Sequence, residues 1–269
     1  MPLVASLPMY DLAEVRAATD RLWQLLAAAL RDAGASGVPD TLSRDEPYPE
    51  FLLRGDLLLS QTCGYPLVHA FKDSLRPVAT PCYAVPGCTG AEYSSAVLVR
   101  AASDHQAIDS LRGGVCAVNS PASQSGYNAL RVMLAPLAGD GHFFSEVVVT
   151  GGHLASVEAL ASGRADVCAV DCVTYALFGR YRSSDLQDTR VLTYTPGCPG
   201  LPLVTRADLD DVQLRNIRVA IGEAFSDPTG AEARAALFIE GATALEFEDY
   251  AVVLEMEDRA AALGYAEIK

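Results

Sequence analysis

The feature that most constrains this chain is the form of its hydrophobic runs, which are short and uninterrupted. In residues 95–101 (SAVLVRA) and 115–118 (VCAV) the apolar positions do not alternate with polar ones. This pattern is typical of strands that are covered on both faces. Residues 11–34 have apolar positions at helical spacing and are predicted to form a helix that ends at Gly34. Such an alternation of strands and helices predicts the α/β class, with mostly parallel sheets flanked by helices.

The same alternation continues along the rest of the sequence. Further strands are predicted over residues 2–8, 55–66 and 142–152, with two more over 189–205, and the strand that contains residues 115–118 is predicted over 113–120. Helices are predicted over residues 153–163, 208–225, 229–238 and 247–263. Residues 165–178 are predicted to pass from a strand into a helix. The length of 269 residues is enough for one large domain or two smaller ones of this class.

Charge and hydropathy exclude two classes of partner. The net charge is -14, from 34 acidic and 20 basic residues, whereas a nucleic-acid-binding protein usually presents a basic face. No apolar run approaches the roughly 18 residues of a membrane span. We therefore expect no nucleic acid as a partner and no membrane insertion.

The cysteines and the first residues bear on the compartment. Seven cysteines are an odd number, which does not suit a fully paired disulfide framework and favours a reducing cytoplasm. The first residues, MPLVASLPMYDLAEV, have neither a basic start nor a cleavable apolar core. The predicted location is therefore the cytoplasm, or the periplasm if an export signal was removed.

Four uncharged polar turns follow directly after predicted strands, at residues 60–65, 119–128, 150–156 and 193–202. In open α/β sheets, ligands bind beyond the carboxyl ends of the strands. Where a helix follows the turn, its first N–H groups and its dipole favour an anion. Turns of this composition are also ordinary helix N-caps in any α/β protein. The pattern thus allows either an anion site or simple capping.

The turn at residues 119–128 is the strongest candidate for an anion site. Ser123, Gln124 and Ser125 offer side-chain donors there, and no residue from Gly113 to Leu130 is charged. One helix terminus contributes about 0.3–1 kcal/mol to an anion, whereas micromolar binding needs about 8 kcal/mol. Several turns must therefore converge on one ligand if the anion interpretation holds.

Single residues leave alternatives open. His153 begins a predicted helix and is either a ligand contact or a capping residue. Asp171 ends a predicted strand and either accepts hydrogen bonds from a ligand or caps the helix at Val173. Cys63 lacks a base that the sequence would place beside it for nucleophilic catalysis, and the cysteine spacings do not suit a metal site. We predict no catalytic residue, no metal and no cofactor.

Several short motifs together resemble the phosphate/phosphonate-type solute-binding proteins of ABC transporters. They are S-x-S-G at residues 123–126, G-x-H at 151–153, G-x-A-D at 163–166 with Asp171 after the strand that follows, and the P-G-L-P turn at 199–202. The resemblance extends over most of the chain. It implies a two-lobed type II periplasmic-binding-protein fold, in which each lobe is a mostly parallel sheet flanked by helices.

The resemblance also implies domain boundaries and a binding site. Residues 1–100 and 195–269 would form lobe one, residues 101–194 would form lobe two, and the ligand would lie in the cleft between them. The ligand-binding residues implied are Tyr10, Gln61, Thr62 and Tyr65 from lobe one, and Ser123, Gln124, Ser125, Gly126, His153 and Asp171 from lobe two. Gln124, in the middle of S-Q-S-G, is expected to influence which ligand is bound.

The function that follows is binding of a small anionic solute, phosphate- or phosphonate-like, with an ABC transporter permease as a partner. This interpretation favours a protein that is not an enzyme. The alternative is a cytoplasmic enzyme on the same fold, a lyase or a biosynthetic enzyme, that acts on a small organic acid. The missing export signal favours the alternative, and the lack of a clear acid–base pair beyond His153 and Asp171 disfavours it.

Overall fold

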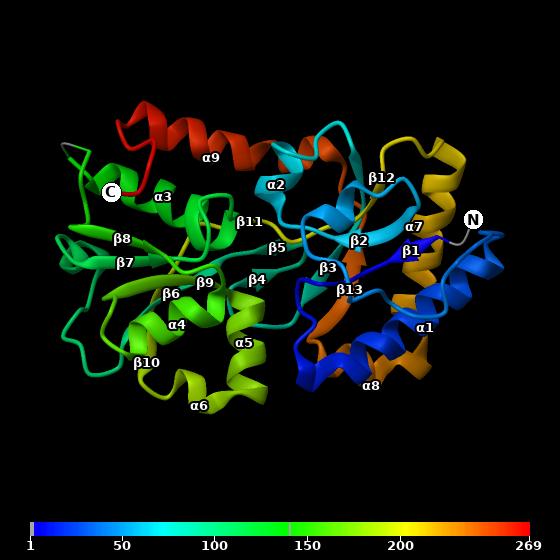
Figure 1. The fold of residues 1–269 in the computed structure, drawn as a ribbon, viewed down its shortest axis with the longest axis horizontal. Helices are drawn as coiled ribbons and strands as arrows, with labels where there is room; N and C mark the ends of the chain where they lie inside the picture. Colours follow the sequence, from blue (N-terminus) through cyan, green and yellow to red (C-terminus); the bar gives the residue numbers. More distant parts are fainter. Residues whose placement is uncertain (1–2, 140) are drawn as a thin grey trace. The chain divides into compact units, whose positions relative to one another are not determined.

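The computed structural model describes residues 3–139 and 141–269 (Figure 1). The chain divides into two units that exchange segments several times. Unit 1 comprises Met1–Ala84, Thr89–Ala91 and Pro199–Asp249, and unit 2 comprises Val85–Cys88, Glu92–Cys198 and Tyr250–Lys269. The α/β two-unit class is as predicted. No helix among the described residues is both long and apolar enough to span a membrane.

The two units differ from the predicted lobe boundaries in several segments, and two of them are long. The strand at Ser95–Arg100, assigned to lobe one from the sequence, belongs to unit 2. The C-terminal residues Tyr250–Lys269 also belong to unit 2. In both cases the hydrophobic residues of the segment enter the core of unit 2, which contains Val97, Val99 and Tyr265. Continuity along the chain therefore does not reveal which unit a segment joins.

Unit 1 contains a five-stranded sheet whose order is β1-β2-β12-β3-β13. The strands are β1 (Val4–Ala5), β2 (Leu57–Gln61), β12 (Leu203–Arg206), β3 (Leu75–Tyr83) and β13 (Ile239–Thr243). β1 runs parallel to β2, whereas β12 is antiparallel to both β2 and β3, and β13 is antiparallel to β3. The helices of this unit are α1 (Arg16–Asp32), α2 (Gly64–Val68), α7 (Asp211–Ser226) and α8 (Ala231–Ala236). α1 packs against α7 and α8.

The helices of unit 1 form where the sequence provides an apolar stripe and a terminating signal. α1 buries Leu22, Trp23, Leu26 and Leu30 on one face, and the chain turns out of the helix at Gly34, whose φ is +86°. α7 begins with a capping box in which the Asp210 carboxylate accepts from the Gln213 N–H at 2.8 Å and the Gln213 side chain accepts from the Asp210 N–H.

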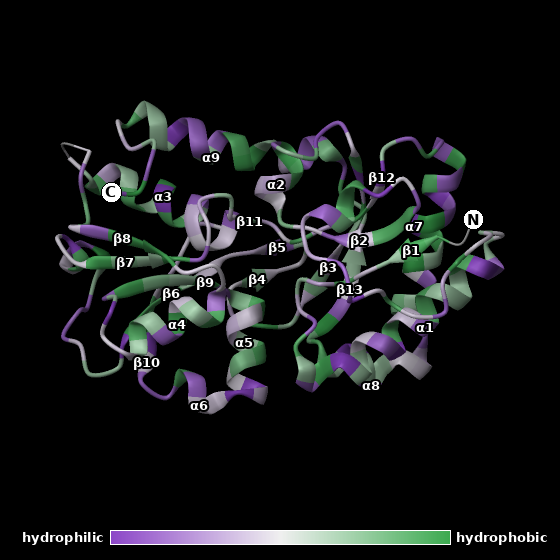
Figure 2. Cartoon of the chain, viewed as in Figure 1, coloured by the Kyte–Doolittle hydropathy of each residue, from purple (hydrophilic) through white to green (hydrophobic). Residues whose placement is uncertain are grey.

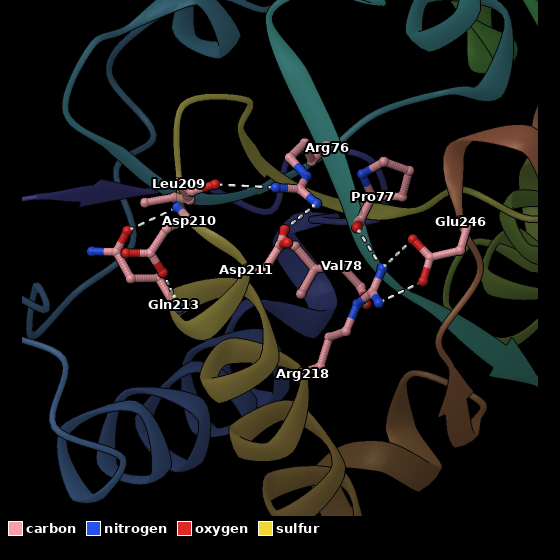
Figure 3. A network of polar contacts seen from close by, with 9 residues as sticks. All are labelled: Arg76, Pro77, Val78, Leu209, Asp210, Asp211, Gln213, Arg218 and Glu246. Atoms are coloured by element: carbon pink, nitrogen blue, oxygen red, sulfur yellow. Dashed lines mark hydrogen bonds and ion pairs between the residues drawn. The ribbon is translucent and has the colours of Figure 1, made fainter.

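Arg76 on β3 and Arg218 in the middle of α7 connect the strand with this helix and with Glu246 (Figure 3). Arg76 donates to the Leu209 carbonyl and to the Asp211 carboxylate, both at 3.1 Å. Arg218 donates to both carboxylate oxygens of Glu246, at 2.6 and 2.8 Å, and to the carbonyls of β3. These contacts fix α7 along the sheet of unit 1.

Unit 2 contains a second five-stranded sheet, in the order β10-β6-β9-β7-β8. The strands are β10 (Thr189–Tyr194), β6 (Ser95–Arg100), β9 (Val167–Asp171), β7 (Val115–Val118) and β8 (Glu146–Val149). β9, β7 and β8 run parallel, whereas β6 is antiparallel to both β9 and β10. Figure 2 shows hydrophobic residues along β6 and β7.

Helices cover both faces of this second sheet. α3 (Ala129–Leu134) contributes Leu130 and Leu134 to the core on one face. α4 (His153–Ala161) contributes Val157 and Leu160 to the core on the other face. α9 (Ala251–Ala262) packs against α3, and α5 (Cys172–Tyr181) and α6 (Ser183–Leu186) follow β9. The short strands β4 (Cys88–Thr89), β5 (Glu92–Tyr93) and β11 (Cys198–Pro199) lie where the chain passes from one unit to the other.

The sheets are mixed rather than mostly parallel within each unit. β6 and β9 are an antiparallel pair, and yet nearly every residue in both strands is buried. A continuous apolar run indicates that a strand is buried on both faces. A central strand is buried in this way whether it runs parallel or antiparallel to its neighbours, so the run does not predict the strand direction. The sequence prediction also missed β3, which carries Pro77 and Pro81, residues that usually interrupt a strand.

Candidate functional site

One edge of the unit 2 sheet gathers most of the predicted site. β9, β7 and β8 are parallel neighbours, so their carboxyl ends lie at the same edge. The antiparallel strand β6 starts at this edge, because Ser95 is the register partner of Asp171. The turns after β7, β8 and β9 and the start of β6 therefore lie close together, which is where ligands bind in open α/β sheets.

The serine-rich turn after β7 is organised by its own hydroxyl groups. Ser123 is the N-cap of a π-helical turn, Gln124–Asn128, and its Oγ accepts from the Gly126 N–H at 3.0 Å. The π-helical turn leads directly into α3. Ser95 Oγ donates to the Ser125 carbonyl at 2.8 Å. The start of β6 thus holds the turn in place, and the sequence analysis did not select Ser95 for this role.

Two serines and a histidine form a chain of polar contacts. Ser123 Oγ lies 3.5 Å from Ser125 Oγ, which lies 3.2 Å from His153 Nε2. Burial lowers the pKa of His153 to about 4, so the imidazole is neutral at neutral pH. His153 Nδ1 is buried and has no hydrogen-bond partner among the described residues. This series of polar contacts therefore ends in a neutral imidazole, which can either donate or accept a hydrogen bond.

Gly126 lies directly against the Asn119 side chain. A Cβ built at Gly126 would be 1.9 Å from Asn119 Oδ1 and 3.3 Å from His153 Cε1. Asn119 Oδ1 is itself buried without a hydrogen-bond partner among the described residues. The space in front of Gly126 is thus taken by the residue that follows β7. The sequence signal that would have selected Asn119 was its position immediately after a buried strand.

Asp171 caps a helix, which is one of the two roles left open by the sequence. Its Oδ1 accepts from the N–H groups of Val173 at 2.8 Å and Thr174 at 3.0 Å. The residue is 2% exposed and is the N-cap of α5. The carboxylate is therefore committed to the start of α5, and its predicted contact with a ligand stays a prediction.

Gln124 is directed to the interior of unit 2 instead of joining the serine hydroxyls. Its Nε2 lies 3.4 Å from Cys198 Sγ and 3.3 Å from Met256 Sδ, and its Oε1 accepts from Asn128 Nδ2 at 2.7 Å. The side chain is 0% exposed. The amide thus makes these contacts inside unit 2, and the predicted contribution of Gln124 to ligand binding stays a prediction.

A buried arginine supports this turn from behind. Arg131 Nη2 donates to Asn128 Oδ1 at 2.6 Å and forms an ion pair with Glu257 on α9 at 3.3 Å. Its Nη1 donates to the Ala266 carbonyl at 2.7 Å, and the residue is 4% exposed. A polar chain therefore runs from Gln124 through Asn128 and Arg131 to the C-terminal segment of the chain.

The four site residues predicted in unit 1 make contacts inside that unit. Tyr10 is 8% exposed and its ring meets the Tyr83 ring edge-on, with the centroids 5.3 Å apart. Gln61 Nε2 donates to the Leu201 carbonyl at 3.1 Å. Thr62 Oγ1 lies 3.1 Å from the Tyr48 hydroxyl.

The last of the four, Tyr65, is near the start of α2 and lies beside His69, which follows the last residue of that helix. The Tyr65 and His69 rings lie 4.3 Å apart, centroid to centroid. A cavity of about 30 Å³ adjoins Tyr10 and Gln61, which is room for roughly one water molecule.

No metal centre emerges from the part of the chain that the structure describes. No group of three or more His, Cys, Asp or Glu side chains lies in a position to hold an ion there. The site therefore consists of hydroxyls, a neutral imidazole and backbone groups, which suit hydrogen bonds to an oxyanion.

Comparison with known proteins gives one family match. The model of a family described as the periplasmic substrate-binding protein of the ABC transporter for phosphonate matches residues 4–250. Among curated proteins, no sequence matches this chain.

Solved structures with the same fold come from several bacteria. A binding-protein component of an ABC phosphonate transporter from Pseudomonas aeruginosa has a TM-score of 0.75 at 13% identity, covering 98% of this chain and 88% of that one. PhnD1 from Prochlorococcus marinus, in complex with methylphosphonate, has a TM-score of 0.72 at 15% identity, covering 96% and 98%. XAC2383 from Xanthomonas citri, bound to ATP, has a TM-score of 0.70 at 18% identity, covering 97% and 98%.

Proposed function

The chain belongs to the phosphonate-type periplasmic substrate-binding proteins of ABC transporters, and we propose that it binds a small phosphonate or phosphate-like anion at Ser123, Ser125 and His153. The family favours solute binding over the enzyme alternative. A permease of an ABC transporter is the partner that this family implies, and the periplasm is the compartment.

The observation that carries the proposal is the contact chain from Ser123 through Ser125 to His153. A tetrahedral oxyanion needs several donors around one centre, and this contact chain supplies three side-chain groups, two from the turn before α3 and one from the start of α4. One known member of the fold, PhnD1 from Prochlorococcus marinus, was solved with methylphosphonate. That ligand class matches the donors present here.

The charge of the protein shapes how such a ligand would be recognised. The turn holds no charged side chain, and the net charge of the protein is -14. Long-range attraction of an anion is therefore absent, so affinity rests on local hydrogen bonds. The contributions predicted for Tyr10, Gln61, Thr62 and Tyr65 stay predictions.

A ligand screen by thermal shift and calorimetry tests the proposal. The panel contains methylphosphonate, 2-aminoethylphosphonate, phosphate, phosphite, sulfate, methanesulfonate and acetate. A ligand that binds only the folded protein stabilises it by about 2.7 kcal/mol at 100 times its Kd, so a specific ligand raises the Tm clearly. Stabilisation by phosphonates or phosphate, with no effect of acetate, is expected. No response to any tetrahedral anion would contradict the proposal and favour the enzyme alternative.

The double variant Ser123→Ala/Ser125→Ala tests the site itself. It removes two donors to a charged ligand, each worth about 1.5 kcal/mol, so calorimetry is expected to show an affinity loss of about 100-fold for the ligand found in the screen. Loss of the Ser123 cap costs about 1 kcal/mol of stability. Asp210→Ala removes a comparable cap in unit 1 and serves as the matched control, with unchanged affinity. Unchanged affinity in the double variant would place the ligand elsewhere.

A further inference from the structure

Two cysteine thiols face each other in unit 2. Cys88 Sγ lies 3.4 Å from Cys172 Sγ, although the residues are 84 positions apart in the sequence. Cys88 is the first residue of β4 and is partly exposed, whereas Cys172 is the first residue of α5 and is buried (Figure 1). A disulfide bond is about 2.05 Å long, so the sulfurs need to approach by roughly 1.3 Å, which small side-chain rotations can provide.

The backbone around the two thiols holds them in contact. A Cβ at Gly87 would lie 2.9 Å from Cys172 Cβ and 2.8 Å from Ser94 Oγ, and the φ of Gly87 is +96°. Only glycine allows this close approach without strain. Ser94 N and Ser94 Oγ both donate to the Gly87 carbonyl at 2.9 Å, and Cys172 N donates to the Ser94 carbonyl at 3.2 Å. Ser94 therefore binds the Gly87–Cys88 turn and the start of α5 together.

We propose that Cys88 and Cys172 form an intramolecular disulfide when the folded protein meets an external disulfide, and that the bond fixes the segment Val85–Cys88 to the start of α5. This segment belongs to unit 2, although the residues before and after it in the chain belong to unit 1. The proposal concerns a modification of the protein and does not depend on the identity of the ligand.

The reaction is thiol–disulfide exchange with a small external disulfide as the oxidant. The thiolate of Cys88, the more exposed of the two, attacks one external sulfur, which forms a mixed disulfide on Cys88 and releases one external thiol. Cys172 then loses its proton to solvent and its thiolate attacks Cys88 Sγ, which releases the second external thiol. Two protein thiols are oxidised and one external disulfide is reduced to two thiols.

The second step is the slower one at neutral pH. The contact with Cys88, burial and the neighbouring Asp171 carboxylate raise the pKa of the Cys172 thiol. The thiolate is the reactive form, so the rate of ring closure is expected to rise with pH across the range from 7 to 9.

Three other cysteines, Cys82, Cys116 and Cys168, lie in different surroundings. Cys116 and Cys168 are fully buried, and burial raises the pKa of both thiols. Cys82 is partly exposed and its Sγ lies 3.5 Å from Thr243 Oγ1. The Cys88–Cys172 bond would leave five free thiols of seven. An odd cysteine count is thus compatible with one disulfide.

The test uses the full-length protein, equilibrated in buffers of reduced and oxidised glutathione, then acid-quenched and alkylated. Trypsin leaves Cys82 with Cys88, and Cys168 with Cys172, on the same peptides. Chymotryptic cleavage after Tyr83 and Asp-N cleavage before Asp171 separate them, so mass spectrometry can assign the bond. The expected result is a linked Cys88–Cys172 peptide and a Tm at least about 5 °C higher in the oxidised protein.

Serine variants separate this bond from general oxidation. Cys88→Ser and Cys172→Ser add no volume, and each is expected to abolish both the linked peptide and the redox-dependent Tm shift. Cys82→Ser is the matched control and is expected to keep both. Full alkylation of Cys88 and Cys172 in the folded oxidised protein would overturn the proposal. A product that stops at a glutathione adduct on Cys88, or a bond between other cysteines, would overturn it as well.

Discussion

The polar turn after β7 in unit 2 and the polar turn after β2 in unit 1 follow the same sequence pattern but use their side chains differently. In unit 2, Ser123 and Ser125 form a contact chain with His153 at the carboxyl edge of the sheet. In unit 1, Gln61 donates to the Leu201 carbonyl and Thr62 contacts Tyr48. In the unit 2 turn the serine hydroxyls lie close together. In the unit 1 turn the polar side chains form hydrogen bonds with neighbouring segments of the same unit.

The difference lies in what supports each turn. The unit 2 turn is supported from behind by the buried polar contacts of Gln124, Asn128 and Arg131, in addition to the N-cap that Ser123 itself provides. The unit 1 turn is supported by the same residues that were predicted to bind ligand. The turn whose hydroxyls lie together is the one that also has buried polar contacts behind it.

The largest expected effect comes from removing the buried support of the unit 2 turn. Arg131→Met takes donors from Asn128, Ala266 and Glu257, and breaking a buried ion pair from one side costs about 3 kcal/mol. Arg218→Met in unit 1 breaks the more exposed Arg218–Glu246 pair and is expected to cost about 1 kcal/mol. Urea unfolding of both variants measures the difference. Equal losses would show that the turn does not depend on buried support.

Gly126→Ala tests the close approach inside the unit 2 turn. The new methyl group would overlap Asn119 Oδ1, and relieving that overlap is expected to cost about 2 kcal/mol and to weaken ligand binding. Gly222→Ala in α7 meets no atom within 4 Å and is expected to raise stability by about 0.5–1 kcal/mol. Thermal unfolding of the two variants measures both changes in stability. Changes of the same sign would contradict the close contact between Gly126 and Asn119.

His153 gives unit 2 a pH dependence that can be isolated. The folded pKa of about 4 lies below the unfolded value of about 6.5, so the unfolded state binds more protons between these values. The contribution is complete well above pH 6.5 and is lost as the pH falls, by about 2 kcal/mol at pH 5 and about 3 kcal/mol at pH 4. The difference between wild type and His153→Gln, measured by urea unfolding from pH 4 to 8, reports it. Parallel stability curves would exclude a neutral buried imidazole.

The smallest expected effect belongs to the unit 1 turn. A double-mutant cycle of Tyr48→Phe and Thr62→Val isolates the contact between the two hydroxyls, and its coupling is expected to be about 0.5–1 kcal/mol. A coupling near zero would mean that the Thr62 hydroxyl is not used to fasten the turn, and would bring the two turns closer in behaviour.

Much of the architecture followed from local sequence. α1, β6, β7 and α4 were predicted within a few residues of their observed bounds, because apolar spacing, glycine ends and buried runs are properties of short segments. The family was also indicated by short motifs, above all the S-x-S-G turn. β3 was missed because Pro77 and Pro81 hide its strand character.

The α/β class, the serine-rich turn after a buried strand and the family to which that turn belongs could all be inferred from the amino-acid sequence. The direction of β6, the inward orientation of Gln124, the capping role of Asp171 and the contact between Cys88 and Cys172 became known from the packing of the folded chain. Each of these depends on residues far away in the chain: Gln124 meets Met256, which is 132 positions later. Periodicity records whether a position is buried, whereas the partner that buries it is set by how distant segments pack.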